Sequence, residues 1–304
     1  MQTLLNEIVE QCRPQAAQGV VASYIPELAK ADPKDLGICL VTKGECFCAG
    51  EWERRFSMQS VVKPLILLQA LCDSGKERVR SLVGVEATGK PFDAFNYSDQ
   101  ALTGAHINPM VNTGAIALCT LIQGQTYEEK FQRLLSLARK LSGNPGMELM
   151  ESVYLSEKAT GNKNRALAYM LKAYGMIQAP AEELIDCYFK ACSIGASCAD
   201  LARIGSVFAD HGVDTATGER LFDGELARYV NATLATCGMY DGSGEFALNV
   251  GIPAKSGVGG GIMGVVPGRM GIGVYAPALD KKGNSAAGVK VMEMLSEKLQ
   301  LSVY

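Results

Sequence analysis

The sequence predicts an α/β (α+β) fold in which one sheet is assembled from both ends of the chain around an inserted helical lobe. Short β-like runs lie near both ends, whereas the long section between them is rich in helix formers. Successive βαβ units are not evident, which disfavours a parallel doubly wound sheet. We therefore expect a single domain over residues 1–304, with an α/β lobe from about 1–60 and 236–304 and a helical lobe over about 61–235.

The N-terminal section carries the first β-like runs. A helical pattern covers residues 4–12, and a loop follows through Tyr24-Ile25-Pro26. The runs at 36–42 and 45–49 are separated by Lys43-Gly44, which indicates a β-hairpin. This hairpin is the predicted N-terminal part of the sheet.

The middle section has the pattern of a series of helices. Helical spacing begins at 60–71, and the segments 128–143, 164–175 and 197–212 each show apolar residues three to four positions apart and end at a glycine. These segments are predicted to build the helical lobe.

The last seventy or so residues return to β-like patterns. Residues 262–266 and 270–275 are apolar runs interspersed with glycine on either side of Pro267-Gly268, which predicts a second hairpin. A helical pattern at 286–299 follows and is expected to be the terminal helix.

Composition excludes several classes of protein. Hydrophobic residues make up 48% of the chain and charged residues 20%, which is typical of a globular protein rather than a disordered or fibrous one. The 29 Lys and Arg against 32 Asp and Glu leave a net charge of −3, so we expect neither a nucleic-acid partner nor a membrane-surface partner. The first fifteen residues lack the pattern of a secretory signal, and we expect a cytoplasmic protein.

The cysteines and histidines do not suggest a metal site. Ten cysteines without an export signal indicate reduced thiols, and no C-x-x-C pair occurs. Cys46 and Cys48 are predicted to share one face of a strand as small core residues. His106 and His211 are the only histidines, too few for a histidine-rich site or for a choice of triads. We expect no metal and no cofactor.

One S-x-x-K motif occurs, at Ser60-Val61-Val62-Lys63. Pro64 places a helix start at or beside Ser60, because proline is tolerated only near the first turn of a helix. Residues three apart share a helix face, so Lys63 is placed to reach the Ser60 hydroxyl. A lysine buried there would favour its neutral form and act as a base, although such a tetrapeptide also arises by chance.

A second motif, Lys255-Ser256-Gly257, strengthens the first. S-x-x-K early and K-[ST]-G late is the arrangement of penicillin-recognising serine hydrolases, in which the second motif borders the active site on a strand. Val258 and three glycines follow, and a backbone N–H exposed there would complete an oxyanion hole. The alternative interpretation is a glycine-rich turn before a hairpin.

Three polar clusters are further candidates. Asn108 and Asn112 flank a turn before an apolar helix, where a helix cap is the alternative explanation. Glu157 and Asn164 lie seven positions apart and would share a helix face, but the intervening Gly161 argues against one continuous helix. Tyr240 lies beside a turn, a position also typical of a packing residue.

Taken together, these clusters resemble the serine-dependent glutaminase family. The resemblance implies a β-lactamase/penicillin-binding-protein-like fold, a mainly antiparallel sheet flanked by helices plus the inserted helical lobe. It extends through nearly the whole chain. The matching segments are FSMQSVVKP around Ser60, NPMVNTGAI at 108–116, SEKATGNKN at 156–164, CYFKACS at 187–193, CGMYDGSGEFA at 237–247 and AKSGVGGGI at 254–262.

The resemblance also implies the reaction, hydrolysis of L-glutamine to L-glutamate and ammonia through a glutamyl-serine intermediate. It makes Ser60 the nucleophile and Lys63 its base. It makes Tyr240 and Tyr24 assistants in proton movement or amide positioning. The implied oxyanion donors are the N–H groups of Ser60 and Val258. The implied substrate-binding residues are Ser60, Asn112, Glu157, Asn164, Tyr188, Tyr240 and Val258.

This chain departs from the family pattern at one loop. Related members often carry Asp and Arg where it has Asn162-Lys163, so the charge next to Asn164 differs. By the same resemblance we expect a homo-oligomer, either a dimer or a tetramer.

Two other functions remain open at this point. One is another S-x-x-K serine hydrolase of penicillin-recognising or esterase type, although its S-D-N element has only a near match in Ser98-Asp99-Gln100. The other is a non-catalytic amino-acid-binding protein on the same scaffold. Such a protein would keep Glu157 and Asn112 but would not require both Ser60 and Lys63.

Overall fold

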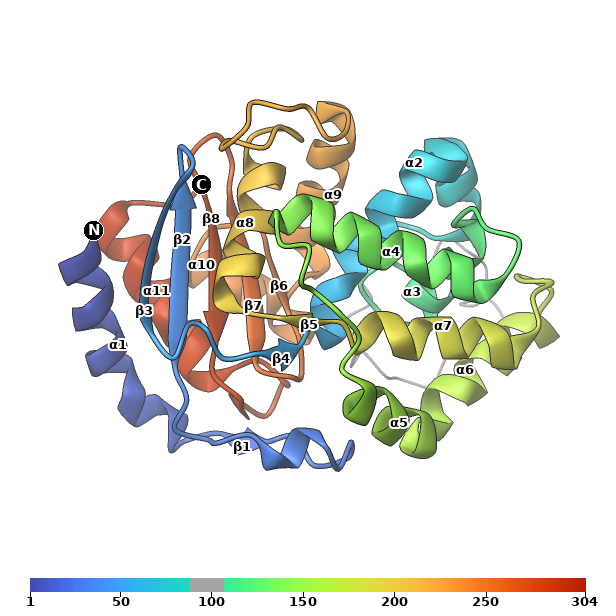
Figure 1. Cartoon of the computed structure of the whole chain (residues 1–304), viewed down its shortest axis with the longest axis horizontal. Coiled ribbons are helices and arrows are strands. Elements are labelled where there is room, and N and C mark those ends of the chain that lie inside the picture. The colour runs from blue at the N-terminus through green and yellow to red at the C-terminus, as the bar shows by residue number, and fades with distance from the viewer. Residues whose placement is uncertain (88–106) are drawn as a thin grey trace.

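The computed structural model describes residues 1–87 and 107–304, and in it a sheet with its covering helices lies beside a group of helices (Figure 1). The main sheet has five antiparallel strands in the order β3-β2-β8-β7-β6. The strands are β2 (Gly37–Thr42), β3 (Glu45–Gly50), β6 (Ala254–Ser256), β7 (Gly261–Val266) and β8 (Met270–Tyr275). Because β2 pairs with β8, the sheet joins the two ends of the chain, as predicted.

Both predicted hairpins are confirmed. In the β2–β3 turn, Lys43 and Gly44 have φ values of 49° and 82°, the left-handed conformation that a tight two-residue turn requires. The β7–β8 turn lies at Pro267-Gly268, where Gly268 has a φ of 69°. These turns set the register that places Ile38 opposite Val274 at the centre of the sheet.

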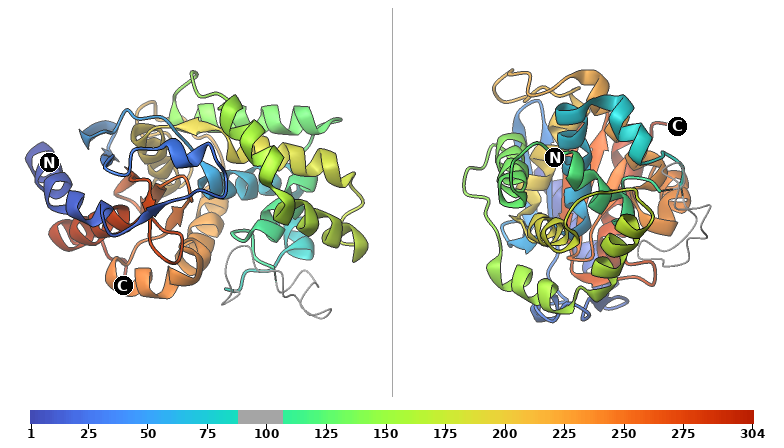
Figure 2. Two further views of the ribbon diagram at one scale, coloured as in Figure 1. Left: turned by 90° about the horizontal axis from the view of Figure 1, so that it is seen from below. Right: turned by 90° about the vertical axis from the view of Figure 1, so that its right-hand side faces the viewer.

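The two faces of the sheet are covered by different helices. On one face, Ile38, Leu40 and Ile272 pack in a core shared with α1 (Gln2–Ala16) and α11 (Ala286–Leu299), which run side by side (Figure 2). The short helix α10 (Ser243–Asn249) contributes to the same core. On the other face, α8 (Cys198–Ala209) packs against β2, β7 and β8.

The helix α8 does not follow the predicted division of the chain into an α/β lobe and a helical lobe. Its residues fall inside the range predicted for the helical lobe, yet the helix covers the sheet. A Cβ on Gly271 would lie 2.0 Å from the Ala202 carbonyl oxygen, and one on Gly273 would lie 2.0 Å from that of Cys198. The glycines of β8 therefore let the backbone of α8 approach the strand directly, a long-range contact that local patterns do not reveal.

The remaining helices form the second part of the structure. They are α2 (Lys63–Leu82), α3 (Asn112–Leu118), α4 (Tyr127–Ser142), α5 (Glu151–Thr160), α6 (Asn162–Ala173), α7 (Ala181–Cys192) and α9 (Gly224–Cys237). The helix predicted at 128–143 is confirmed as α4, which is capped by the Thr126 side chain and followed by Gly143 at a φ of 65°.

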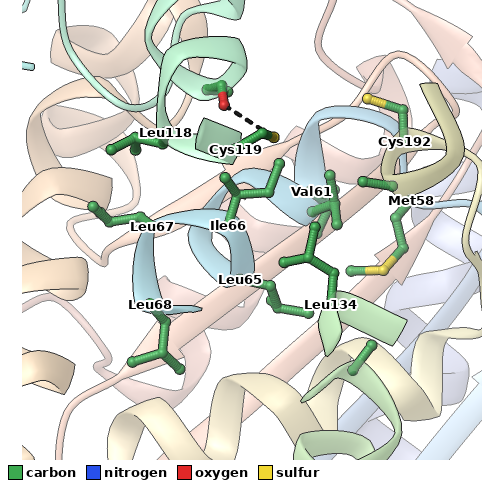
Figure 3. Packing of buried hydrophobic residues seen from close by; sticks show 14 of the residues in the cluster. Met58, Val61, Leu65, Ile66, Leu67, Leu68, Leu118, Cys119, Leu134 and Cys192 are labelled. Atoms are coloured by element: carbon green, nitrogen blue, oxygen red, sulfur yellow. Dashed lines mark hydrogen bonds between the residues drawn. The ribbon is translucent and has the colours of Figure 1, made fainter. Parts of the chain in front are cut away.

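The start of α2 is the centre of the larger core. Figure 3 shows Leu65, Ile66 and Leu67 of α2 close to Leu118 and Leu134 of neighbouring helices. All five side chains are 0% exposed. Tight packing of this kind fixes the first turn of α2, which carries the lysine of the S-x-x-K motif.

Short elements connect the two parts. The strand β4 (Phe56–Ser57) pairs with β5 (Gly195–Ala196), and the 3₁₀ helix η2 (Gln59–Val62) follows β4 at once. A second short pair joins β1 (Val20–Val21) to β9 (Ala278–Leu279). No helix in the described part of the chain is long and apolar enough to cross a membrane.

The expectation of reduced thiols holds for eight cysteines and is wrong for two. Cys39 and Cys48 form a disulfide between β2 and β3. The two residues face each other directly in the register of the hairpin, which brings their sulfur atoms together. Cys46 and Cys48 do share one strand, but the prediction that both are small core residues is wrong, because Cys46 is exposed and Cys48 is half-buried.

Candidate active site

Ser60 lies where β4 passes into a helix. The 3₁₀ helix η2 begins at Gln59 and runs directly into α2 at Lys63, so the predicted helix start at or beside Ser60 is confirmed. Gln59 has a φ of 48°, a left-handed conformation that is unusual for a residue with a side chain. Such backbone strain is typical of functional turns and is held here by the surrounding structure.

The glycine-rich turn between β6 and β7 lies against the turn at Gln59. A Cβ on Gly257 would lie 2.6 Å from the Met58 carbonyl oxygen, and one on Gly259 would lie 2.6 Å from the Ser57 carbonyl oxygen. Both positions therefore need glycine so that the two backbones can approach. This contact places Val258, between the two glycines, on the same cavity as Ser60.

Lys63 is fully buried behind the turn. Its Nζ donates hydrogen bonds to the Asn112 Oδ1 at 2.6 Å and to the Met110 carbonyl oxygen at 3.1 Å. Burial lowers the pKa of Lys63 to about 8, only partly opposed by the negative charges of neighbouring groups. A neutral amine has two N–H groups, and these two acceptors take both of them, which leaves its lone pair free to accept a proton.

Tyr240 lies against the nucleophile. Burial raises the pKa of its phenol above the usual range, while hydrogen bonding to Ser60 and to the Val258 backbone acts in the opposite direction. The residue has a φ of 56°, a second left-handed backbone at the site. The Ser60 side chain thus meets Tyr240, and the Lys63 amine meets Asn112 and Met110.

Lys255 packs against the ring of Tyr240. This lysine of β6 is 0% exposed, and its Nζ donates to the carbonyl oxygens of Gly238 at 2.9 Å and Ser256 at 2.6 Å. The same Nζ lies 4.4 Å from the centre of the Tyr240 ring, a cation–π contact. The lysine of the K-S-G motif therefore holds the tyrosine and its turn.

A cavity of about 330 Å³ opens above Ser60. It is large enough for a small amino acid and brings together residues from both parts of the structure. The sequence-predicted residues among its walls are Tyr24, Ser60, Asn112, Glu157, Asn164, Tyr188 and Val258. Asn162 and Lys163, the positions of the family departure, also line it.

Glu157 places a buried carboxyl group in this cavity. The residue is only 4% exposed, and burial raises the pKa of its carboxyl to about 8, against the opposing effects of Gln59 and Lys63. The Gln59 Nε2 donates to the Glu157 Oε2 at 3.4 Å. A carboxylate so poorly solvated is stabilised by an incoming cation such as an ammonium group.

Polar groups from three helices complete the wall. The Asn112 Nδ2 donates to the Asn164 Oδ1 at 2.8 Å, and the Tyr188 hydroxyl donates to the Asn112 Oδ1 at 3.4 Å. Asn164 lies three residues after Gly161, in the first turn of α6, because α5 ends at Thr160 and α6 begins at Asn162. The predicted interruption at Gly161 is therefore confirmed, and the break turns both side chains toward one cavity.

Gln59 and Cys192 are among the cavity residues that were not predicted from the sequence. Gln59 precedes the nucleophile and contacts Glu157, and its place in the motif segment was the available signal. Cys192 lies one helical turn after Tyr188 on α7, a spacing that could have suggested it. Ser98-Asp99-Gln100 and His106 lie outside the described residues.

Comparisons with known proteins agree with this geometry. A family model named Glutaminase matches residues 19–304. The chain is 51% identical to a glutaminase of Clostridioides difficile, over 100% of the chain and 98% of that protein. It is 49% identical to a glutaminase of Clostridium tetani over the whole of both chains. A solved covalent complex of a Bacillus subtilis glutaminase with 5-oxo-L-norleucine aligns with a TM-score of 0.91 at 35% identity, covering 100% of this chain and 99% of that one.

Proposed function

This chain belongs to the glutaminase family, and on that premise we propose how its residues hydrolyse the side-chain amide of L-glutamine to L-glutamate and ammonia. The fold prediction is confirmed, because the antiparallel sheet flanked by helices matches bacterial glutaminases of β-lactamase-like fold. The observation on which the mechanism rests is the position of Lys63, one helical turn after Ser60. Both N–H groups of its neutral amine are taken up by hydrogen bonds to Asn112 and Met110.

In the first half of the reaction, the Ser60 Oγ attacks the side-chain amide carbon of glutamine. Its proton passes to the neutral amine of Lys63. The negative charge that develops on the amide oxygen is held by the backbone N–H groups of Ser60 and Val258. The carbon–nitrogen bond then breaks, and the proton moves to the leaving nitrogen, which departs as ammonia and leaves a glutamyl-serine ester.

Tyr240 and Tyr24 assist this step, Tyr240 from beside the nucleophile and Tyr24 from the wall of the cavity. Tyr240 contacts Ser60 and Val258 and is placed to carry the proton between the lysine and the leaving nitrogen. Tyr24 lines the same cavity and positions the amide. In the second half, water attacks the ester, L-glutamate leaves, and the Ser60 hydroxyl is restored.

Recognition of the free amino acid comes from the opposite wall. The substrate ammonium pairs with Glu157, whose poorly solvated carboxylate is thereby stabilised. The substrate carboxylate takes hydrogen bonds from the amide and hydroxyl groups of Asn112, Asn164 and Tyr188. A penicillin or ester substrate would not require such a wall. Membership of the glutaminase family argues against both a penicillin-recognising or esterase-type hydrolase and a non-catalytic amino-acid-binding protein.

Two further features are proposed for the molecule as a whole. We propose a homo-oligomer, supported by the exposure of Leu155, Tyr169 and Tyr174, large apolar side chains on or beside α5 and α6. We also propose a cytoplasmic location, supported by the eight free cysteines. Sedimentation of the purified protein and fractionation of cells test these two proposals.

The experiment that tests the mechanism is covalent labelling. Incubation with 6-diazo-5-oxo-L-norleucine followed by peptide mass spectrometry is expected to place the adduct on Ser60, with loss of ammonia production in proportion to labelling. Ser60→Ala is expected to take up no label and to release no ammonia while keeping its circular dichroism spectrum. A label on another residue, or activity retained by Ser60→Ala, would refute the assignment of the nucleophile.

A further inference from the structure

Three cysteines meet at the outer edge of the sheet, away from the catalytic cavity. Cys39 lies on β2 and is bonded to Cys48 on the edge strand β3, directly opposite it in the register. The Cys46 Sγ lies 3.4 Å from the Cys48 Sγ, and the three sulfur atoms all lie within 4.8 Å of one another. A free thiol is thus in contact with a disulfide.

The three sulfurs differ in their exposure. Cys39 is 0% exposed and belongs to the core beneath α8, Cys48 is half-buried, and Cys46 is exposed. A dissolved thiol or disulfide therefore meets Cys46 first. Reaction at the buried Cys39 requires transfer through a neighbouring sulfur, because thiol–disulfide exchange depends on access to the sulfur attacked.

We propose that Cys46 is the exchange thiol of a redox site, through which low-molecular-weight thiols and disulfides open and close the Cys39–Cys48 bond. Cys39, Cys46 and Cys48 together form this three-cysteine site. The site is assigned from the contact between Cys46 and Cys48 and from the graded burial of the three sulfurs.

Closure of the reduced site proceeds by three exchanges. The Cys46 thiolate attacks a dissolved disulfide, which releases one small thiolate and leaves a mixed disulfide on Cys46. The Cys48 thiolate then attacks the Cys46 sulfur and expels the second small thiolate. Finally the Cys39 thiolate attacks the Cys48 sulfur and frees Cys46. Two protein thiols are oxidised, one small disulfide is reduced to two thiols, and opening follows the same path in reverse.

A positive charge next to Cys46 favours these steps. Partial burial raises the pKa of the Cys46 thiol, and the guanidinium of Arg203 on α8 acts in the opposite direction. Arg203 is held in place by an ion pair of 3.0 Å with Asp214. Because the net effect raises the pKa of the Cys46 thiol, exchange through its thiolate is expected to be faster at higher pH.

The redox site is separate from glutamine hydrolysis. In the strand order β3-β2-β8-β7-β6, the three-cysteine site occupies one edge, whereas β6 and Lys255 border the catalytic site at the other edge. Glutaminase activity therefore serves as a check that each cysteine variant is folded.

The test follows disulfide formation in the full chain. The protein is reduced with dithiothreitol, desalted, mixed with oxidised glutathione, and trapped with N-ethylmaleimide at intervals for peptide mass spectrometry. Wild-type protein is expected to form the Cys39–Cys48 disulfide with Cys46 left alkylated. Cys48→Ser is expected to accumulate glutathione on Cys46. Cys46→Ser is expected to close the bond at least about tenfold more slowly, because the two remaining sulfurs are shielded.

The matched control is Cys72, an exposed cysteine of α2 that lies outside the three-cysteine site. Cys72→Ser is expected to close the Cys39–Cys48 bond at the wild-type rate. The proposal is overturned if Cys46→Ser closes the bond as fast as wild type, or if Cys46 in Cys48→Ser takes up glutathione no faster than Cys72. Isolation of the reduced site with a bound soft metal ion in place of a disulfide would also overturn it.

Discussion

The Lys63 amine and the Asn112 side-chain oxygen lie 2.6 Å apart, although the two residues are 49 positions apart in the sequence. This contact joins the base to the substrate wall, because the other end of the Asn112 amide donates to Asn164. The Asn112 amide is thereby oriented by Lys63 and Asn164. Because this amide is neutral, it places no negative charge beside Lys63.

The neutrality of Asn112 gives the first prediction. Asn112→Asp keeps the size of the side chain and places a carboxylate beside Lys63, which stabilises the protonated amine and raises its pKa by about 1–3 units. We expect kcat at pH 7.5 to fall at least about tenfold, and the pH midpoint of kcat to move upward by about one unit or more. Steady-state kinetics from pH 6 to 10 measure both effects. A lower kcat with an unchanged midpoint would contradict the electrostatic role of Asn112.

The pH dependence of the wild-type enzyme follows from two buried groups. The pKa of Lys63 is lowered to about 8, so the neutral base is lost as the pH falls below that value. The pKa of Glu157 is raised to about 8, so the carboxylate that binds ammonium is lost over the same range. We expect kcat/KM to rise steeply from pH 6 to about 8 with apparent values that belong to the coupled pair. We expect kcat to rise less steeply, because bound substrate keeps Glu157 ionised. Activity that falls over this range would refute a neutral lysine base.

Ionisation of Glu157 is expected to lower the free energy of unfolding of the protein. Because its pKa is raised from 4.5 to about 8, the folded protein retains a proton there that the unfolded chain releases, so stability falls as the pH rises between these values. We expect Glu157→Gln to have a higher melting temperature than wild type at pH 8 and an equal one at pH 4. The same variant is expected to raise KM for glutamine roughly 100-fold, because it removes a buried charge partner of the ammonium. Calorimetry at both pH values and steady-state kinetics check these outcomes, and a KM within twofold of wild type would argue against the ammonium contact.

Several parts of the fold and site were predictable from local patterns. The hairpin at Lys43-Gly44 is signalled by its turn residues, and the helix start at Ser60 by Pro64, so both were predicted correctly. The cavity residues of the family motifs were also predicted, and the structure brings them together. Their roles in catalysis stay predictions until variants are measured.

Other features depend on contacts between distant parts of the chain. The packing of α8 on the sheet needs the glycines of β8, and the Cys39–Cys48 disulfide depends on the strand register. No residue near Lys63 in the sequence indicates that Asn112 will hold its amine. The left-handed backbone at Gln59 lies in a turn against which Gly257 and Gly259 pack closely, a long-range contact that the propensity of a single residue does not encode.

Lys255 is expected to act on catalysis by positioning Tyr240. Lys255→Met removes the cation under the Tyr240 ring and leaves the carbonyl oxygens of Gly238 and Ser256 without their donor. We expect kcat to fall roughly 10- to 100-fold, with KM and the pH midpoint of kcat nearly unchanged. Steady-state kinetics measure both constants, and an unchanged kcat, or a loss that appears only in KM, would contradict the positioning role of Lys255.

Gln59 combines a strained backbone with a contact to Glu157, and two substitutions separate these effects. Gln59→Ala and Gln59→Gly both remove the amide that donates to Glu157, so both are expected to raise KM for glutamine to a similar extent. Only glycine adopts a φ of 48° without cost, and Gln59→Gly is therefore expected to be more stable than Gln59→Ala by about 1 kcal/mol. Urea unfolding at one pH measures this difference. Equal stability of the two variants would show that the turn carries no strain, whereas unequal KM values would show that backbone conformation, and not the Gln59 amide, positions Glu157.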